Sequence, residues 1–238
     1  MIFKIKQFGI LLLIVCVCVV SVLSTNLKNQ YTFASVNTVI KPQIILDAGH
    51  GGFDGGAVAN DGTVEKDINL KICLKLASLL KSSGYNVILT RESDVSTDDV
   101  ETDKIPSRKK SDLRNRLKLM KDFPDSVFIS IHLNKFTTAS ANGAQIFYSE
   151  KTEESKVLAE NIRKSIVGML QKDNTRVNKK STSSTYILHN ATVPAVLVEC
   201  GFLSNSQELE KLKNSEYQSQ MAFSVFCGIT EYFSKGTI

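Results

Sequence analysis

The sequence predicts a single α/β domain in which a mostly parallel or mixed central sheet carries helices on both faces. Three observations support this prediction. Short apolar runs alternate along the chain with segments of helical periodicity. Several of these runs are apolar without interruption, which is typical of strands buried on both faces. The 238 residues, 42% of them hydrophobic, suffice for one substantial core, and the sequence shows no internal repeat.

The first half of the domain alternates between strand and helix. The apolar run 43–46 predicts a strand, and the glycine-rich stretch 47–52 after it predicts a tight turn. Apolar residues at helical spacing over 68–79 predict a helix that ends near Gly84. The run 86–90 (NVILT) predicts a second strand, so the chain returns to the sheet after the helix.

The middle of the chain continues this alternation after one interruption. The acidic segment 92–103 has no regular pattern and is expected to be a surface insertion. Apolar residues over 113–120 then predict a helix, and the run 127–131 predicts a strand. A further strand is expected over 144–148, followed by a helix over 157–170.

The end of the chain supplies the last strand and two helices. The run 195–198 (AVLV) is the final apolar strand, and helices are expected near 207–212 and 217–233. Cys73, Cys200 and Cys227 fall within these elements, widely spaced and odd in number. We therefore expect them to be small buried hydrophobic residues rather than disulfide partners.

The N-terminus has the outline of an export signal. Lys4 and Lys6 precede the apolar run 10–23, so residues 1–24 are expected to be a signal peptide or a membrane anchor. The two alternatives stay open, because the run is short for a membrane span and no clear cleavage site follows it. Residues 25–42 are polar and are expected to link this leader to the domain.

The charge of the chain argues against nucleic-acid binding. The formal net charge is +5, and the longest unbroken basic run is only 108–110. Nucleic-acid recognition needs a concentrated basic patch, which such a run does not provide. A weakly positive chain is instead suited to anionic surfaces such as a cell wall.

Three acid or imidazole side chains stand where predicted strands end. His50 and His132 come just after two strands, and Glu199 ends a third. Because ligands of open α/β sheets bind at the carboxyl ends of the strands, these residues are expected to converge. Glu65, which opens the helix after the glycine-rich turn, is a candidate third metal ligand beside the two histidines. Imidazole and carboxylate donors of this kind suit zinc.

Each of these residues also has a structural interpretation. A histidine at a strand end is often only hydrogen-bonded, and Glu65 alone is a normal first-turn carboxylate. Glu199 is less easily explained, because a carboxylate that ends an apolar strand is costly without a cation or a reaction. His189 lies in a polar stretch and either contacts the substrate or lies on the surface.

Four motifs in order resemble a known family. They are Ile44–Gly52 (IILDAGHGG), Glu65, Ile129–Asn134 (ISIHLN) and Pro194–Asn205 (PAVLVECGFLSN). These motifs are similar to those of the zinc-dependent N-acetylmuramoyl-L-alanine amidases, and the resemblance runs from about Gln43 to the final helix. It implies that 43–238 is a zinc amidase catalytic domain acting on peptidoglycan.

The resemblance also implies roles for the site residues. His50, Glu65 and His132 would be the zinc ligands, and Glu199 the catalytic carboxylate. The VPAVLVECGFLSN run is most similar to the sporulation amidases, which prepare spore cortex for germination. In that subfamily a deacetylase then converts stem-free muramic acid to muramic lactam. The segment 92–103 is longer than in a minimal member, and His189 replaces a common Arg or Lys.

Several residues and functions have more than one interpretation. Asp47 and Asn134 would orient the metal ligands, although turn formation explains Asp47 equally well. Cys200 should point away from Glu199, because successive strand residues face opposite sides. Alternative functions are another zinc hydrolase, either a peptidase or a deacetylase, and an inactive wall-binding domain. Dependence on an exported activating protein is a further alternative. The protein itself is expected to be exported and to act at the outer face of the membrane, in the cell wall or in the spore intermembrane space.

Overall fold

The structure of the protein, a computed structural model, describes residues 42–236. The expected leader, 1–24, and all of the expected linker except Pro42 lie outside these residues. Within the described part, no helix combines the length and the apolar character needed to cross a membrane.

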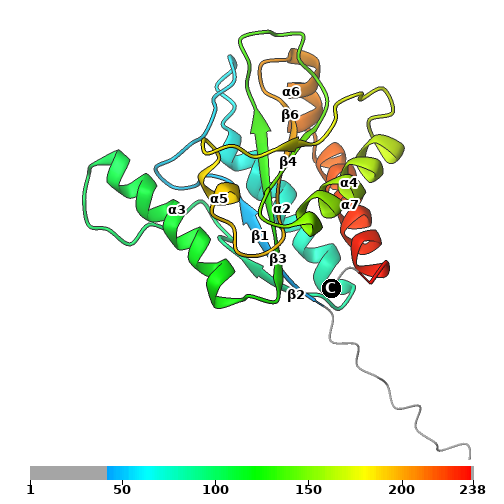
Figure 1. The fold of residues 1–238 in the computed structure, drawn as a ribbon. Helices are drawn as coiled ribbons and strands as arrows, with labels where there is room; N and C mark the ends of the chain where they lie inside the picture. The colour runs from blue at the N-terminus through cyan, green and yellow to red at the C-terminus, as the bar shows by residue number, and fades with distance from the viewer. Residues whose placement is uncertain (1–41, 237–238) are drawn as a thin grey trace, which may run out of the picture. The chain divides into compact units, whose positions relative to one another are not determined.

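A mixed sheet forms the centre of the fold (Figure 1). In the described part of the chain it has six strands in the order β2-β1-β3-β6-β4-β5. Neighbouring strands from β2 to β6 run parallel, and β4 is antiparallel to β6. The predicted α/β fold is confirmed. The strands are β1 (Gln43–Ala48), β2 (Asn86–Leu89), β3 (Ser126–Asn134), β4 (Gln145–Tyr148), β5 (Lys179–Lys180) and β6 (Ala195–Phe202).

Helices cover both faces of this sheet. In Figure 1, α4 and α7 lie on one side of the strands, with α3 and α5 on the other. The helix α2 packs against α7 and the strands β1 and β3, and α6 contacts β6 and α7. The helices are α2 (Glu65–Ser82), α3 (Ile105–Asp122), α4 (Glu153–Met169), α5 (Tyr186–His189), α6 (Ser206–Lys213) and α7 (Ser215–Ser234).

Side chains of β3 alternate between two core clusters. Val127, Ile129 and Ile131 are fully buried in the larger cluster, which α2, α4 and α7 complete. Phe128 is buried in the smaller cluster beneath α3 and α5. Since successive strand residues point to opposite faces, His132 lies on the same face as Phe128. The pleat of the strand thus directs this histidine towards the side of the sheet that carries α3 and α5.

Two predicted strand ends were wrong. Both β3 and β6 continue past the predicted ends, to Asn134 and Phe202, so His132 and Glu199 lie within strands rather than just beyond them. The reason is that the two strands keep pairing: His132 is opposite Glu199 and Asn134 is opposite Phe202, with an irregularity between the two pairs. This pairing depends on the partner strand, so the apolar runs do not reveal it.

Other predictions agree with the structure. The segment 92–103 contains no helix or strand and lies largely on the surface. Helix α3 begins at Ile105, earlier than the apolar spacing over 113–120 predicts. That spacing does not reveal the first two turns, because they are mostly polar and contain Pro106, which is tolerated in a first turn. Cys73 and Cys200 are buried, Cys227 is partly buried, and all three are free thiols. The expected burial is thus confirmed for Cys73 and Cys200 and holds in part for Cys227.

Candidate metal centre

A tight turn after β1 brings His50 to the site. Gly49 packs so closely against His132 that an added Cβ would lie 2.2 Å from the Nε2 atom of that ring. At Gly56, a Cβ would lie 2.5 Å from the Oε2 atom of Glu65. His50 itself has a φ of 63°, a left-handed conformation that few residues other than glycine adopt. The glycines therefore allow the backbone to approach the three side chains closely.

Glu65 is buried at the start of α2, with 3% of its surface exposed. Its Oε1 atom accepts hydrogen bonds from the Leu133 amide (3.0 Å) and from the Asn69 side chain (3.2 Å). Its Oε2 atom accepts one from the Ala57 amide (2.8 Å). Burial alone would raise the pKa of Glu65, but hydrogen bonds and charge from the two histidines outweigh it, and the pKa falls well below its usual range.

Glu65 joins the two histidines into one compact group. Its Oε1 atom lies 3.0 Å from Nδ1 of His132, and its Oε2 atom lies 3.3 Å from Nε2 of His50. The ligand atoms of all three residues lie within 4.8 Å of one another. Donor atoms around a tetrahedral ion with bonds of ~2.0 Å are separated by about 3.3 Å, so this spacing fits a metal. The three side chains therefore form a group that could hold a metal ion.

His50 has a second carboxylate neighbour, Asp54, which the sequence did not single out. Asp54 contacts Nδ1, the ring nitrogen that faces away from Glu65. The Nδ1 atom of His50 lies 2.9 Å from Oδ2 of Asp54, and the Nζ atom of Lys109 lies 3.1 Å from the same oxygen. Burial opposes a charged His50, but Asp54 and Glu65 together raise its pKa to about 9. Chiefly through the hydrogen bond from His50, the pKa of Asp54 is lowered well below its usual range.

Glu199 lies opposite His132 on the neighbouring strand β6. Its Oε2 atom is buried and has no hydrogen-bond partner among the described residues. Burial raises the pKa of Glu199 to about 7, with a further contribution from Glu65 against the opposing charge of His132. A carboxyl group with such a pKa can both accept and return a proton near neutral pH. Cys200 is fully buried in the larger core cluster, away from this face as predicted.

A buried arginine fixes the turn that carries His50. Arg116 of α3 is 2% exposed. Its Nη1 atom donates to Asp47 and, at 3.0 Å, to the carbonyl oxygen of Ala48. Its Nη2 atom donates to the carbonyl oxygen of His50 at 2.7 Å. Asp112 completes the network, accepting from Nε at 2.8 Å. The charge of this arginine thus restrains the backbone conformation of His50.

Asp47 and Asn134, the two residues expected to orient the metal ligands, make no hydrogen bond to a ligand side chain among the described residues. Asp47 bonds to Arg116, Thr90 and Ser130 rather than to a candidate ligand, so it acts on the His50 turn through Arg116. Asn134 ends β3, where its carbonyl oxygen accepts from the Leu203 amide at 2.8 Å. Within residues 42–236, no hydrogen bond joins the Asn134 side chain to the three ligand side chains.

Four supporting residues were absent from the sequence analysis: Asp54, Asn69, Arg91 and Arg116. Arg91 donates to the carbonyl oxygens of Ala48 (2.9 Å) and Gly49 (3.1 Å), so a second buried arginine holds the same turn. One signal was available for Asn69, which lies one helical turn after Glu65. Another was available for Arg116, which follows Asp112 by four residues and can therefore pair with it on one helix face.

A mostly apolar cavity of about 200 Å³ reaches His132 between α3 and α5. Phe128 and Leu197 from the sheet and Leu113 from α3 contribute to its walls. His189 lies at the end of α5, half-buried, with a buried Nδ1 atom that has no partner among the described residues. It is not one of the residues that line this cavity, so its expected contact with substrate stays a prediction.

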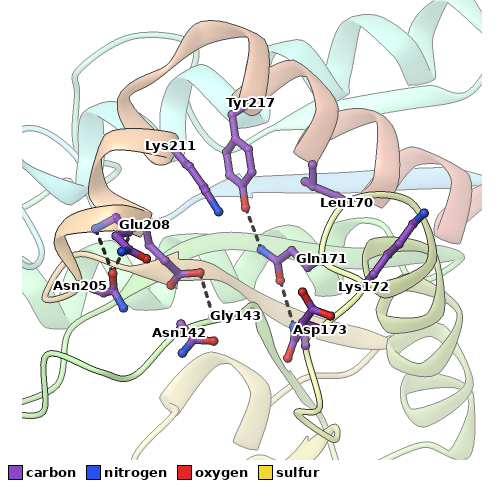
Figure 2. Close-up of a pocket in the computed structure, with 12 residues that line it drawn as sticks. Asn142, Gly143, Leu170, Gln171, Lys172, Asp173, Asn205, Glu208, Lys211 and Tyr217 are labelled. Atoms are coloured by element: carbon purple, nitrogen blue, oxygen red, sulfur yellow. Dashed lines mark hydrogen bonds between the residues drawn. The ribbon is translucent and has the colours of Figure 1, made fainter.

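A larger cavity, of about 340 Å³, lies near the end of α4 beside α6 and α7 (Figure 2). It contains none of the four candidate site residues. Its polar side chains bond to one another and to backbone: Nε2 of Gln171 lies 2.9 Å from the Tyr217 hydroxyl, and Oε1 of Glu208 accepts from the Gly143 amide at 2.8 Å. These groups explain the local structure without a ligand.

The fold is that of an α/β protein whose His–Glu–His group could hold a metal ion, as in a metal-dependent hydrolase. The profile of the N-acetylmuramoyl-L-alanine amidase family matches residues 44–231, and the chain belongs to this family. It therefore acts on peptidoglycan, at the amide bond between N-acetylmuramic acid and L-alanine. The resemblance found in the sequence is confirmed.

Several relatives are similar over most of the chain. The germination-specific N-acetylmuramoyl-L-alanine amidase of Bacillus subtilis is 38% identical over 192 residues, which cover 81% of this chain and 80% of the relative. The CwlD amidase from Clostridioides difficile, solved in complex with the GerS lipoprotein, is 42% identical, with a TM-score of 0.78 over 82% of this chain and 100% of that one. The amidase AmiC2 of Nostoc punctiforme is 29% identical, with a TM-score of 0.69 over 81% of this chain and 97% of that one.

Proposed function

We propose that the chain hydrolyses its amide bond with zinc held by His50, Glu65 and His132, and with Glu199 as the general base and acid. The observation that carries this proposal is the buried, unpartnered Oε2 atom of Glu199 next to a compact His–Glu–His group. A buried polar atom without a partner is costly in a structural role and useful in a catalytic one.

The three ligands suit a catalytic zinc ion. Two imidazole nitrogens and one carboxylate oxygen are a common zinc donor set, and three protein ligands leave a position for substrate or water. When bound, zinc supplies a Lewis acid that polarises the lactyl carbonyl and lowers the pKa of water. Burial and the amide donors to Glu65 keep its carboxylate fixed for this purpose.

Glu199 carries the proton between the two halves of the reaction. Its Oε2 atom takes a proton from the attacking water as the water oxygen bonds to the lactyl carbonyl carbon. The same oxygen then gives this proton to the L-alanine nitrogen as the C–N bond breaks. The products are the muramic carboxyl group and a stem peptide with a free amine. Burial raises the pKa of Glu199 in the metal-free protein, which favours proton uptake by this carboxylate.

The apolar cavity beside His132 offers room for the groups that flank the scissile bond. The lactyl and alanyl methyl groups are small and apolar. Leu113, Phe128 and Leu197 give the cavity apolar walls that these methyl groups can contact. Burial of each methyl group would contribute about 0.8 kcal/mol to substrate binding. The cavity thereby favours an acyl-alanine bond over a bond between charged residues.

The biological role that we propose is spore cortex maturation. Support comes from the similarity to the germination-specific amidase of Bacillus subtilis and to the CwlD amidase. The stem-free muramic acid would pass to a deacetylase and become muramic lactam. The protein would be exported and would act at the outer face of the membrane, in the wall or in the spore intermembrane space. The complex of CwlD with the GerS lipoprotein supports an exported activating protein as a partner.

Mass spectrometry of digested peptidoglycan tests the proposed reaction. The zinc-loaded full chain should release intact stem peptides with a free L-alanine amine, and removal of zinc by a chelator should stop this release. Cleavage within the stem peptide would indicate a peptidase, and release of acetate would indicate a deacetylase. Release that needs an added purified lipoprotein, from protein that already binds zinc, would establish the partner.

A further inference from the structure

We propose that Asp54 is a positioning residue of the metal centre: it holds the His50 ring by its Nδ1–H group, so that Nε2 faces the metal, and Lys109 holds Asp54 in place. The inference rests on the proposed role of His50 as a metal ligand. Asp54 would not contact the ion. It would act entirely through the orientation and the tautomer of His50.

The contacts of the His50 ring assign its two nitrogens. Nδ1 lies 2.9 Å from Oδ2 of Asp54, and Nε2 lies 3.3 Å from Oε2 of Glu65. An ionised carboxylate only accepts hydrogen bonds, so once Nε2 binds a cation the remaining proton of the His50 ring is on Nδ1, facing Asp54. A carboxylate behind a metal-binding histidine fixes the tautomer and increases the basicity of the ligand nitrogen.

His132 presents the other nitrogen and does not need this support. Its Nδ1 atom is the one that lies 3.0 Å from Glu65. Its ring is held from the opposite side by close packing against Gly49, where an added Cβ would be 2.2 Å from Nε2. Packing therefore orients His132, whereas a charged hydrogen bond orients His50. A change at Asp54 should affect His50 alone.

The backbone of His50 makes a side-chain restraint necessary. A φ of 63° is uncommon for a residue with a Cβ and stores strain that its surroundings must offset. Arg116 holds the carbonyl oxygen of His50 at 2.7 Å but does not contact its ring. Within the described part of the chain, Asp54 is the residue that bonds to the outer nitrogen of the ring.

Asp54 is itself held at both its backbone and its side chain. Its amide and carbonyl groups exchange hydrogen bonds with Gly51, at 3.1 and 2.9 Å. Its Oδ1 atom accepts from the Gly56 amide at 3.3 Å. Lys109, whose side chain is 50% exposed, lies 3.1 Å from Oδ2. Exposed ion pairs are weak, so loss of Lys109 should matter less than loss of Asp54.

Asp94 provides a matched control on the same turn. Its Oδ1 atom accepts from the Gly52 amide at 2.9 Å, and its Oδ2 atom pairs with Lys66 at 2.7 Å. Asp94 thus restrains the turn through a carboxylate and a lysine, as Asp54 does, but contacts no candidate ligand side chain. The variant Asp94→Leu removes the acceptor in the same way as Asp54→Leu, so it separates loosening of the turn from loss of ring orientation.

The test measures zinc affinity of the full chain by competition with a chromogenic chelator. Asp54→Leu, which removes the acceptor at similar size, should weaken zinc binding by about 10- to 100-fold. Asp54→Asn keeps an acceptor oxygen and should recover part of this loss. Lys109→Met should have a smaller effect, and Asp94→Leu should stay within about twofold of the parent. Nitrogen-15 NMR of the zinc-loaded parent should show a protonated Nδ1 and a metal-bound Nε2 on His50.

Two results would overturn the proposal. One is zinc affinity of Asp54→Leu within about twofold of the parent. The other is an equal loss in Asp94→Leu. If Asp54→Leu does not fold, as judged by thermal unfolding of the zinc-free protein, then the NMR result on the parent and on Asp54→Asn decides. A parent that binds no zinc would instead refute the proposed function, so the two failures are distinguishable.

Discussion

The candidate metal centre and the cavity of Figure 2 differ in how their buried glutamates are bonded. Burial raises the pKa of Glu199 beside the cavity at His132, and it also raises the pKa of Glu208 in the cavity of Figure 2. Glu208 accepts from two backbone amides, those of Gly143 and Phe202, each at 2.8 Å. The Oε2 atom of Glu199 has no such partner. The backbone amides account for the buried Glu208 carboxylate, whereas no hydrogen bond among the described residues accounts for Oε2 of Glu199.

The largest effect should come from removal of a ligand. Glu65→Gln replaces a charged donor in the His–Glu–His group and should weaken zinc binding by more than about 100-fold, since even outer residues of such sites cost 10- to 100-fold. Turnover should disappear with the metal. Metal content after dialysis, measured by elemental mass spectrometry, checks this. Full zinc occupancy in Glu65→Gln would show that the metal binds at another site. The contrast between the candidate metal centre and the cavity of Figure 2 would then lose its basis.

The next effect concerns the buried charge behind the His50 turn. Arg116→Met leaves Asp47 and Asp112 buried without their cation, and the free energy of unfolding should fall by about 3–5 kcal/mol. Urea denaturation of the zinc-free protein measures this change. A parallel variant, Arg116→Met with Asp47→Leu, should lose less than the sum of the single variants. Additive losses would show that the two residues act independently.

A smaller effect is expected in the cavity of Figure 2. Gln171→Leu removes the side chain that bonds to the Ala144 amide and the Tyr217 hydroxyl. The free energy of unfolding should fall by about 1–3 kcal/mol, because these groups lose a partner. Turnover per folded, zinc-loaded molecule should not change. A selective fall in turnover would mean that this cavity takes part in the reaction.

The smallest effect is the pH dependence of the Asp47–Arg116 pair. Burial would raise the pKa of Asp47, but Arg116 and hydrogen bonds from Ser130 and Thr90 lower it below its ordinary value of 3.8. The unfolded chain therefore binds the proton first. The stabilisation is complete above about pH 4 and is lost as the pH falls through the folded pKa, by at most about 1.4 kcal/mol per pH unit.

Urea denaturation of the parent and of Asp47→Asn from pH 7 to pH 3 measures this dependence. The difference in the free energy of unfolding should be constant down to about pH 4 and should shrink below it. If the difference in the free energy of unfolding stays constant to pH 3, the protonation of Asp47 is not coupled to unfolding in this way.

The sequence predicts the layers of the fold because burial leaves a periodic trace. Apolar runs such as 127–131 mark buried strands, and apolar spacing over 68–79 marks α2. Strand ends leave no such trace, since β3 and β6 continue only because His132 and Glu199 pair. The two-residue strand β5 likewise exists only through its pairing with β4.

The candidate site was predictable where a residue type is unusual for its position. His50, His132 and Glu199 stand out because they follow apolar runs, and the structure brings them together with Glu65. The supporting residues could not be found in this way. Asp54 is an ordinary residue of a glycine-rich turn, and its contact with His50 depends on the left-handed backbone there.

One paired measurement tests the central claim that chemistry resides at the unsatisfied glutamate. Stem-peptide release from peptidoglycan is compared for the zinc-loaded parent, Glu199→Gln and Glu208→Gln. We predict that Glu199→Gln binds zinc but releases peptides about 10²- to 10⁴-fold more slowly, the usual contribution of a general acid or base. Glu208→Gln should match the parent for equal amounts of folded protein. Parent-like release by Glu199→Gln, or an equal loss in both variants, would contradict the claim.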